Sequence, residues 1–244
     1  MRTVFFDIDD KTDELRYLLI NDRERAREFE EKFEVSWIFH ENALEGAVLD
    51  IFDLKVALDH ASTSDGILIP TYQRIRNHKN AIEKMKETAN ESNRAPSLSF
   101  IKQLHQILSH GMQGQAGGVY RKDIPIHRSY FHEIVDPSRI SYLMNKMVKD
   151  FKSKDFKQLH PLQQAAEVHF MMMNVFPFDA DTGKVARLLM NFFAIRGNYY
   201  PIIIPDIERQ HYYEALRGNA ATLRALIVRS TEQQLDQALR FFNA

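Results

Sequence analysis

The sequence predicts a mostly α-helical protein. Gly and Pro are sparse, with 9 and 8 copies in 244 residues, and apolar residues recur mostly at helical spacing. Long helices joined by short connections account for both observations. The chain shows no internal repeat and no break in composition. We therefore expect one domain with an N-terminal extension rather than two independent units.

The N-terminal half is expected to contain a short strand followed by helices. Val4–Asp10 is an apolar segment that ends in aspartates and suits a short strand. Thr12 can then cap a helix, because its side-chain oxygen can accept hydrogen bonds from the first-turn amides. The charged stretch Asp22–Lys32 is typical of a solvated helix face. Further helices are expected from Leu54 through the 50s, over Pro70–Thr88, and from a Ser97 or Ser99 cap through Leu108.

The C-terminal half contains the only expected hairpin. Gly114–Gly118 precedes Val119–Val135, a segment rich in Ile, Tyr and Phe that favours a short β-hairpin. Helices are expected on its C-terminal side over Ile140–Phe151, Leu162–Phe176 and Gly183–Arg196, with two more inside Ile207–Phe242, broken at Gly218-Asn219.

Composition excludes several classes of protein. The 32 basic and 33 acidic side chains leave a net charge of −1, which argues against a nucleic-acid binder. The chain has no cysteine, and therefore no disulfide, thiolate zinc site or cysteine nucleophile. No apolar run approaches the ~20 residues that a membrane helix needs. We expect a cytoplasmic protein that binds neither nucleic acid nor membrane, although leaderless export to another cell stays open.

The turn between two apolar helices, Phe176–Arg187, is the main candidate for a binding site. Gly183-Lys184 falls where helix amide groups lack acceptors, so the turn can bind an anion, with Lys184 and Arg187 adding positive charge. It is not a phosphate-binding P-loop, because no strand precedes it and no earlier glycine has the required spacing.

The same segment resembles the core motif of the Fic family, H-x-F-x-(D/E)-G-N-G-R-x-x-R, which lies between two helices. Pro177, Phe178, Gly183 and Arg187 fall in register with it. The similarity extends over roughly Trp37–Phe242. It includes His169, Gly118–Arg121, the expected hairpin at Ile124–Ile134, Tyr199–Pro201 and Tyr212–Leu216. The resemblance implies a Fic-type helical bundle with a short β-hairpin flap, whose residues include Ile124, Ile126 and His127.

The catalytic positions depart from the family pattern. Phe176 stands where the family has the histidine that acts as general base, and Phe has no proton acceptor. Ala180 aligns with the acidic Mg²⁺ ligand, although Asp179 or Asp181 could supply an oxygen from a neighbouring position. Asp181, Thr182 and Lys184 replace the next glycine, the Asn and the first Arg of the motif. We therefore predict no metal site and no intact catalytic residue, with Thr182, Gly183, Lys184 and Arg187 as the remaining anion or nucleotide contacts.

A second motif, His40–Gly46, is similar to the inhibitory helix of many Fic proteins, (S/T)-x-x-x-E-(G/N). Glu45 and Gly46 match it, and Glu41 stands at the Ser/Thr position. In the family this Glu pairs with the second motif arginine, so the resemblance implies an ion pair between Glu45 and Arg187. The expected domains are accordingly an N-terminal extension over residues 1–36 and a Fic-like domain over 37–244, with the inhibitory helix around 40–46.

These observations favour a degenerate Fic protein, a pseudoenzyme with a regulatory or protein-binding role. The expected partner is a protein held in the flap groove, or a second copy of the chain. No cofactor is expected under this interpretation. The alternative is an active nucleotidyltransferase, or a transferase of another phosphate-containing group, that uses ATP with Mg²⁺ and a different base.

Overall fold

The computed structural model describes residues 5–47, 50–59, 68–91, 95–125 and 133–244. All regular elements in these ranges are helical, and strands are absent from them. None of the described helices is long and apolar enough to cross a membrane.

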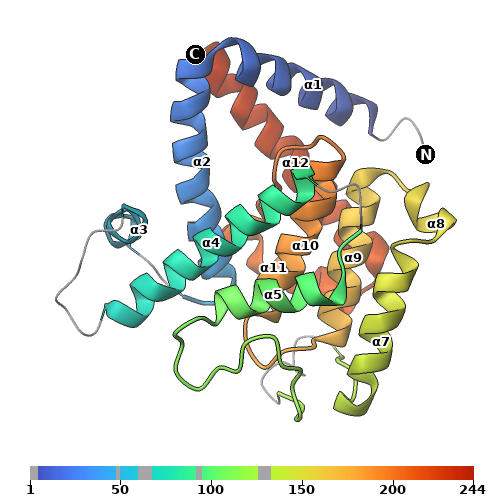
Figure 1. Cartoon of the computed structure of the whole chain (residues 1–244). Coiled ribbons are helices and arrows are strands. Elements are labelled where there is room, and N and C mark those ends of the chain that lie inside the picture. Colours follow the sequence, from blue (N-terminus) through green and yellow to red (C-terminus); the bar gives the residue numbers. More distant parts are fainter. Residues whose placement is uncertain (1–4, 48–49, 60–67, 92–94, 126–132) are drawn as a thin grey trace.

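The chain begins with two helices and ends with one that returns to them. α1 (Phe6–Asn21) and α2 (Arg23–Leu44) are followed by α3 (Ile51–Leu58), α4 (Ile69–Glu91) and α5 (Leu98–Leu108). The second half contains α7 (Pro137–Asp150), α8 (Lys154–Lys157), α9 (Pro161–Val175), α10 (Thr182–Arg196), η2 (Asp206–Glu208), α11 (Arg209–Arg217) and α12 (Ala220–Asn243). In Figure 1 the C-terminal end of α12 lies beside the start of α2, where Arg25 Nη1 donates to the Phe242 carbonyl at 2.6 Å.

α10 is the central helix of the bundle. It packs against α9 as an antiparallel pair and also contacts α4 and α5, while α12 packs against α1, α9 and α11. Every residue of α10 from Thr182 to Ala194 is buried. A helix buried on all sides satisfies its backbone internally, but each polar side chain it carries must find a partner inside the protein. This requirement applies to Lys184, Arg187 and Asn191.

The predicted opening strand is wrong. Although residues 1–4 are outside the described ranges, α1 already begins at Phe6, so the cap at Thr12 is wrong as well. The Thr12 hydroxyl donates to the Ile8 carbonyl at 2.6 Å inside the helix. The buried positions Phe5, Ile8, Thr12 and Leu15 follow the helical period. Asp7 and Asp9 lie in the first turn, where negative side chains stabilise a helix by interacting with the positive end of its dipole.

The remaining helices follow the predictions closely. The Ser97 hydroxyl accepts from the Phe100 amide at 3.2 Å, as expected for the cap of α5. The C-terminal break at Gly218-Asn219 separates α11 from α12, and the Asn219 side chain caps α12. α2 runs continuously through residue 36, so the segment 40–46 ends a helix that starts in the predicted N-terminal extension.

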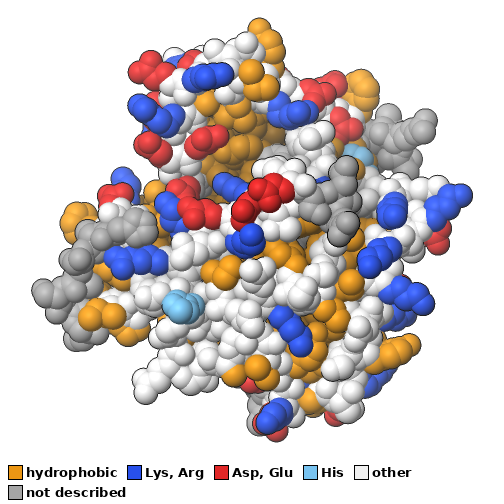
Figure 2. Space-filling view, in the orientation of Figure 1, with side chains coloured by type: hydrophobic (Ala, Val, Ile, Leu, Met, Phe, Trp, Pro, Cys, Tyr) orange, Lys and Arg blue, Asp and Glu red, His pale blue; other side chains and the backbone are white. Residues whose placement is uncertain are grey.

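The predicted flap falls largely outside the described residues. Ile126 and His127 belong to the stretch 126–132, of which nothing is described. Ile124 is described and exposed, and the described flanks Val119–Pro125 and Glu133–Val135 carry no strand. The β-hairpin is therefore not seen. In Figure 2 lysines and arginines gather over α7 and α8, on the right.

The cap of α12 can be tested by mutation. Asn219→Ala removes the acceptor of the Ala221 and Thr222 amides, at 2.9 and 3.2 Å, and should cost about 1 kcal/mol of unfolding free energy. Thermal unfolding should show this as a fall of roughly 2–4 °C in Tm. The control Asn243→Ala, at the C-terminal end of the same helix, should leave Tm unchanged.

Candidate functional site

The turn that joins α9 to α10 contains two residues in the left-handed region, Phe176 at φ 44° and Asp181 at φ 55°. Thr182, directly after them, closes the turn, because its hydroxyl lies 3.0 Å from both the amide and the carbonyl of Phe178. The Phe178 ring is fully buried and stacks on His105 with ring centroids 3.9 Å apart. Thr182 therefore shapes the turn, and its hydroxyl is already engaged within the protein.

His105 fixes this turn to α5. The Gly118 amide donates to His105 Nδ1 at 2.8 Å, so the proton lies on Nε2, which donates to the Ala180 carbonyl at 3.1 Å. Burial lowers the pKa of His105, although Asp181, Asp179 and the Ala180 carbonyl act in the opposite direction. The imidazole is thus a neutral positioning group with both nitrogens occupied.

Arg121 holds the end of α9 from the other side. Its Nε donates to the Phe176 carbonyl at 2.6 Å and its Nη2 to the Val175 carbonyl at 3.2 Å. Its backbone amide donates to the Pro177 carbonyl at 2.9 Å. These bonds satisfy carbonyls that the helix end leaves open. They also hold Phe176 in a conformation that costs a bulky residue about 1–2 kcal/mol.

Phe176 itself is a packing residue. Its side chain is only 2% exposed, and a benzyl group offers no lone pair to a proton. Its backbone amide continues the helix by donating to the Met172 carbonyl at 2.8 Å. The position at the end of α9 therefore carries apolar packing and no acid–base chemistry.

The Glu45 carboxylate lies directly on the first turn of α10. A Cβ atom built on Gly183 would fall well inside contact distance of Glu45 Oε1, and 3.1 Å from Arg187 Nη1. Gly46 makes this approach possible, because its φ of +85° ends α2 and leaves Glu45 at the helix end. The N-terminus of α10, where helix amides favour an anion, is therefore covered by an anion of the protein itself.

The predicted ion pair between Glu45 and Arg187 is present, with Arg187 Nη2 3.0 Å from Glu45 Oε1. Arg187 also meets a second carboxylate, since its Nε lies 2.5 Å from Glu41 Oε2. Its Nη1 donates to the Tyr212 hydroxyl at 3.3 Å. The Arg187 side chain is 1% exposed and that of Glu41 is 3% exposed, whereas Glu45 retains 16%. Glu41 is thus the buried partner and Glu45 the partner near solvent.

Burial and pairing act in opposite directions on these charges. Burial alone lowers the pKa of Arg187, but Glu41, Tyr212 and Glu45 outweigh it and raise that pKa well above its ordinary value. Burial raises the pKa of Glu41, and Arg187 opposes this rise. Arg187 consequently stays charged and requires at least one ionised carboxylate beside it.

Part of this chain matches a known family of proteins. Residues 95–194, which contain the turn and α10 as far as Ala194, match the model of the Fic/DOC family. These residues are a Fic/DOC-family domain.

Full-length relatives extend the similarity to α2. The chain is 27% identical over 207 residues to a protein adenylyltransferase Fic of Aedes aegypti, covering 83% of this chain and 41% of that protein. It is 26% identical over 237 residues to one of Nematostella vectensis, covering 95% of this chain and 55% of that protein. This chain thus spans about half the length of the curated relatives it matches.

The fold is shared with a solved fragment of Fic-1 from C. elegans. The TM-score is 0.84 at 18% identity, with 98% of this chain and 72% of that chain covered. Identity at this level supports the common helical fold alone.

Two more charged residues of the turn between α9 and α10, Lys184 and Asp181, pair with each other. Lys184 Nζ lies 3.1 Å from Asp181 Oδ1, with 3% of the Lys184 side chain exposed. The cation that sequence analysis assigned to anion binding is thus already neutralised by the aspartate at the N-cap of α10. Asp181 also stands where the family motif has a glycine, which has no side chain.

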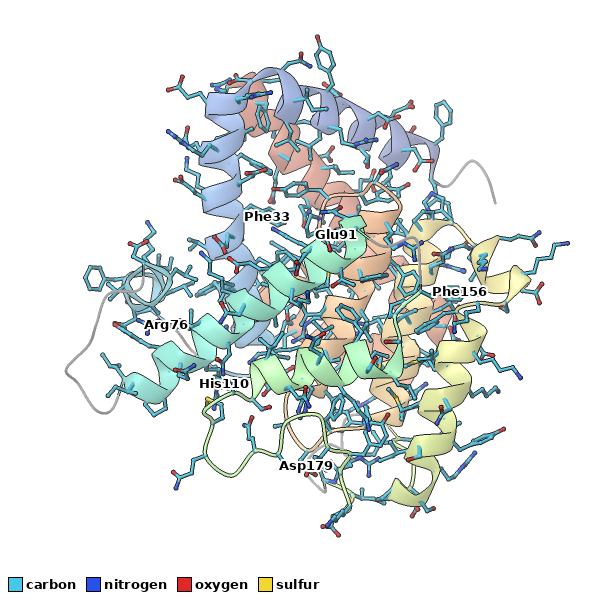
Figure 3. All side chains as sticks on the ribbon, in the orientation of Figure 1. Phe33, Arg76, Glu91, His110, Phe156 and Asp179 are labelled. Atoms are coloured by element: carbon cyan, nitrogen blue, oxygen red, sulfur yellow. The ribbon has the colours of Figure 1, made fainter. Side chains whose placement is uncertain are left out.

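Neither weak metal candidate gains partners in the structure. Asp181 is bound to Lys184, and Asp179 is exposed at the lower edge of the bundle in Figure 3. No group of three or more His, Asp or Glu side chains suited to a metal ion occurs in the described part of the chain. The donor set at this turn does not fit Mg²⁺, which prefers several oxygen ligands in octahedral geometry.

Two buried histidines, His169 and His78, lie near Arg187. His169 Nε2 lies 2.9 Å from the Tyr212 hydroxyl and so helps to orient the group that Arg187 contacts. His78, on α4, is fully buried, and neither of its ring nitrogens has a hydrogen-bond partner within the described residues. Burial, with Lys184 and Arg187 nearby, holds the pKa of His78 well below its ordinary value. It is therefore a neutral group beside two cations.

Sequence reasoning missed the roles of Glu41, Tyr212 and His78. Glu41 carried a usable signal, because it precedes Glu45 by four residues and so lies on the same helix face. Tyr212 was noted only as part of Tyr212–Leu216, a segment similar to the Fic family, and was given no role of its own. His78 had no signal, because its position against α10 depends on the packing of α4.

The contact between Glu45 and Gly183 can be measured by a double-mutant cycle. Gly183→Ala should lower the unfolding free energy by about 1–3 kcal/mol, because the new methyl group meets the carboxylate. In a Glu45→Ala background the cost should fall, since the remaining close contact, 3.1 Å to Arg187 Nη1, is milder and the helix propensity of Ala is favourable. Urea unfolding of the four proteins gives the coupling energy. An equal cost in both backgrounds would contradict this contact.

The two carboxylates should differ in their effect on stability. Glu41→Ala should cost about 3–5 kcal/mol, because it removes the fully buried partner of Arg187. Glu45→Ala should cost less, about 1.5–3 kcal/mol, since water reaches this position. Glu28→Ala, which breaks the exposed pair with Lys32, is the control and should fall within 0.5 kcal/mol. Chemical unfolding measures all three, and a larger loss for Glu45 than for Glu41 would overturn this ranking.

Proposed function

We propose that this chain is a catalytically degenerate Fic protein that acts by binding rather than by nucleotidyl transfer. The observation that carries the proposal is Phe176, a buried aromatic residue at the end of α9 where the family pattern has its general base. General acid–base catalysis requires a group that can take a proton within hydrogen-bond reach of the reacting atom. Phe176 cannot supply it.

Among the described residues, the histidines nearest the turn do not replace the missing base. His105 has both nitrogens engaged by Gly118 and Ala180. His169 is buried and bound to Tyr212. His78 lies fully inside the protein against α10, where a target hydroxyl cannot reach it. These contacts support the pseudoenzyme interpretation over an alternative base.

The ion pairs of the site oppose nucleotide binding as well. Arg187 is held by two carboxylates and Lys184 by a third, so both cations of the motif are already paired. A triphosphate would have to displace Glu45 from the N-terminus of α10 and approach Asp181 against like charge. We call Glu41, Glu45 and Arg187 the α2 lock, and propose that it keeps the anion site closed.

Because catalysis and nucleotide binding are both opposed, the proposed role of this helical fold is to bind a protein. The proposed partner is a protein segment at the flap, which includes Ile124, or a second copy of the chain, and the proposed location is the cytoplasm. The alternative, an active AMP or phosphate-group transferase, requires ATP with Mg²⁺ and a base elsewhere. The relatives named protein adenylyltransferase give that alternative its support.

Calorimetric titration with ATP and Mg²⁺ tests the proposal. The wild-type chain should show no binding up to millimolar ATP. Glu45→Gly should still bind at most weakly, because Glu41 continues to hold Arg187. Glu41→Ala combined with Glu45→Gly frees the arginine, and any ATP affinity should appear in this variant. Adding Arg187→Ala to that pair is the matched control, and it should abolish whatever binding appears.

A transfer assay with radiolabelled ATP then separates the two functions. The wild type should label neither itself nor a cell extract. Phe176→His in the doubly substituted background restores the imidazole but keeps Ala180 and Asp181, and its transfer should stay well below that of an intact Fic protein. Labelling by the wild type that is lost in Arg187→Ala would establish an active enzyme and reject the pseudoenzyme.

A further inference from the structure

A large cavity lies at the side of the bundle where α8 joins α9. It is bounded by α8, the start of α9, the end of α10 and the segment that leads into α5. Its volume is about 1020 Å³, near the upper end of the range for ligand pockets. Among the described residues that line it, none belongs to α2 or to the turn between α9 and α10. The cavity is therefore separate from the α2 lock.

Space remains there because α8 is short. α8 is a single turn of four residues, too short to cover the ends of the two long helices behind it. Those ends lie against each other, because a Cβ atom built on Gly197 would fall well inside contact distance of the Pro161 ring. The start of α9 and the end of α10 thus form a closed wall, and the cavity opens beside them.

Three phenylalanines line the apolar part of the cavity. The rings of Phe151, Phe156 and Phe193 contact one another, with centroids 5.3–5.4 Å apart. Phe156 lies between α8 and the start of α9 (Figure 3). Leu159 and Pro161, which are half-buried, add apolar surface to the wall. The cavity can therefore receive an apolar side chain of a ligand.

The charged groups of the wall are all basic. Lys152, Lys157 and Arg196 line the cavity, and none of the described residues that line it is acidic. Lys152 and Lys157 are exposed, and neither forms an ion pair within the described part of the chain. The Gln164 amide nitrogen already donates to two backbone carbonyls, both at 3.1 Å. The ammonium groups of the two lysines are thus available to an anionic ligand.

The positive charge continues along α7. Residues 137–157 contain six basic and two acidic side chains, although the whole chain has a net charge of −1. Arg139, Tyr142, Lys146 and Lys149 are exposed and follow one another at spacings of three or four residues, so they share one face of the helix. We call this face, together with Lys152 and Lys157, the basic surface; it lies on the right in Figure 2.

We propose that the cavity and the basic surface bind an acidic segment of a partner protein, which places an apolar side chain in the cavity and carboxylates beside Lys152 and Lys157. Complementary charge steers such a partner and orients it, while burial of an apolar side chain supplies affinity. The basic face of α7 is ~15 Å long, further than a small anion reaches. This inference does not depend on the proposed function, because neither Phe176 nor the α2 lock takes part in it.

Two other polyanions suit the charge but not the apolar part. A single-stranded nucleic acid stacks successive bases on exposed aromatic rings, and Tyr142 is the single exposed ring among the described residues of the basic surface. A membrane surface is bound by apolar side chains that project outward, whereas the apolar groups here line a cavity. A protein segment uses both the cavity and the charge.

Binding is tested with an unlabelled acidic peptide, acetyl-Glu-Asp-Glu-Phe-Leu-Asp-Glu-Glu-amide. Calorimetric titration into the full chain at low salt should give a Kd on the order of 10–100 μM, as for a small transient interface. A control peptide with Gln and Asn in place of the acids should bind about tenfold more weakly or less. A control with Ala in place of Phe and Leu should lose about fivefold or more. No binding of the acidic peptide, or equal affinity of either control, overturns the assignment.

Charge reversal locates the site. Lys152→Glu combined with Lys157→Glu should weaken the acidic peptide about tenfold or more and leave Tm nearly unchanged, because both side chains are exposed and form no ion pair within the described residues. Arg23→Glu combined with Lys55→Glu makes the same change of charge at exposed positions of α2 and α3. This matched control should bind like the wild type. Unchanged binding in the first pair, or equal weakening in both, would contradict the site.

Ala95→Trp tests the cavity without changing the charge. Ala95 lies on the cavity wall, so the indole should occupy the space and weaken the acidic peptide about tenfold or more. Thermal unfolding shows whether the variant is folded, and the alanine-substituted peptide tests the same contact on the unaltered protein. Unchanged affinity in a folded Ala95→Trp variant would place the peptide outside the cavity and overturn this part of the inference.

Two further probes separate the classes of partner. A single strand of oligothymidylate and vesicles of phosphatidylcholine with phosphatidylserine should both bind more weakly than the acidic peptide at the same salt concentration, because neither places an apolar side chain in the cavity. Tighter binding of the single strand would assign the basic surface to a nucleic acid, and tighter binding of the vesicles would assign it to a membrane. Either result overturns the protein partner.

Discussion

The buried guanidinium of Arg187 is the constraint that organises the rest of this site. A cation with 1% of its side chain exposed is tolerated only if the protein surrounds it with acceptors, and here α2 supplies two carboxylates and α11 a phenol. α2 must therefore end where Glu41 and Glu45 reach α10, and Gly46 ends it there. Gly183 must lack a side chain, because the Glu45 carboxylate occupies that space. The end of α2 and the glycines at positions 46 and 183 are thus all explained by the buried charge of Arg187.

The balance of charge around α10 is consistent with a closed anion site. Arg187 and Lys184 are the two cations of the turn, and both are in contact with carboxyl groups of the protein, Glu41, Glu45 and Asp181. An anion-binding turn needs cations without such partners, since helix amides and cations attract phosphate by their combined positive potential. His78, buried beside both cations, adds no negative charge and accepts no hydrogen bond within the described residues. The protein neutralises its own cations and leaves little potential for a ligand.

Much of this arrangement could be predicted from the sequence, and the failures have identifiable causes. Helix ends such as Ser97 and Asn219 are encoded locally, because a side chain caps amides two or three residues away. The pair between Glu45 and Arg187 spans 142 residues and was predicted only through the family motif. The strand at Val4–Asp10 was wrong because an apolar segment that ends in aspartates was interpreted as a strand, whereas Ile8, Thr12 and Leu15 follow a helical period. Glu41 was treated as a substituted position rather than as a charge that a buried arginine needs.

Under the proposed function, the loss of the base and the closing of the anion site are independent changes, and this bears on whether one substitution could restore activity. Phe176 is fixed by packing and by Arg121, which holds the surrounding carbonyls whatever side chain stands there. The α2 lock is fixed by burial of Glu41 and does not involve Phe176. A histidine at position 176 would thus face a turn that still carries Asp181 and a paired Lys184. Since uncoupled defects add in free energy, repairing either one leaves the full cost of the other.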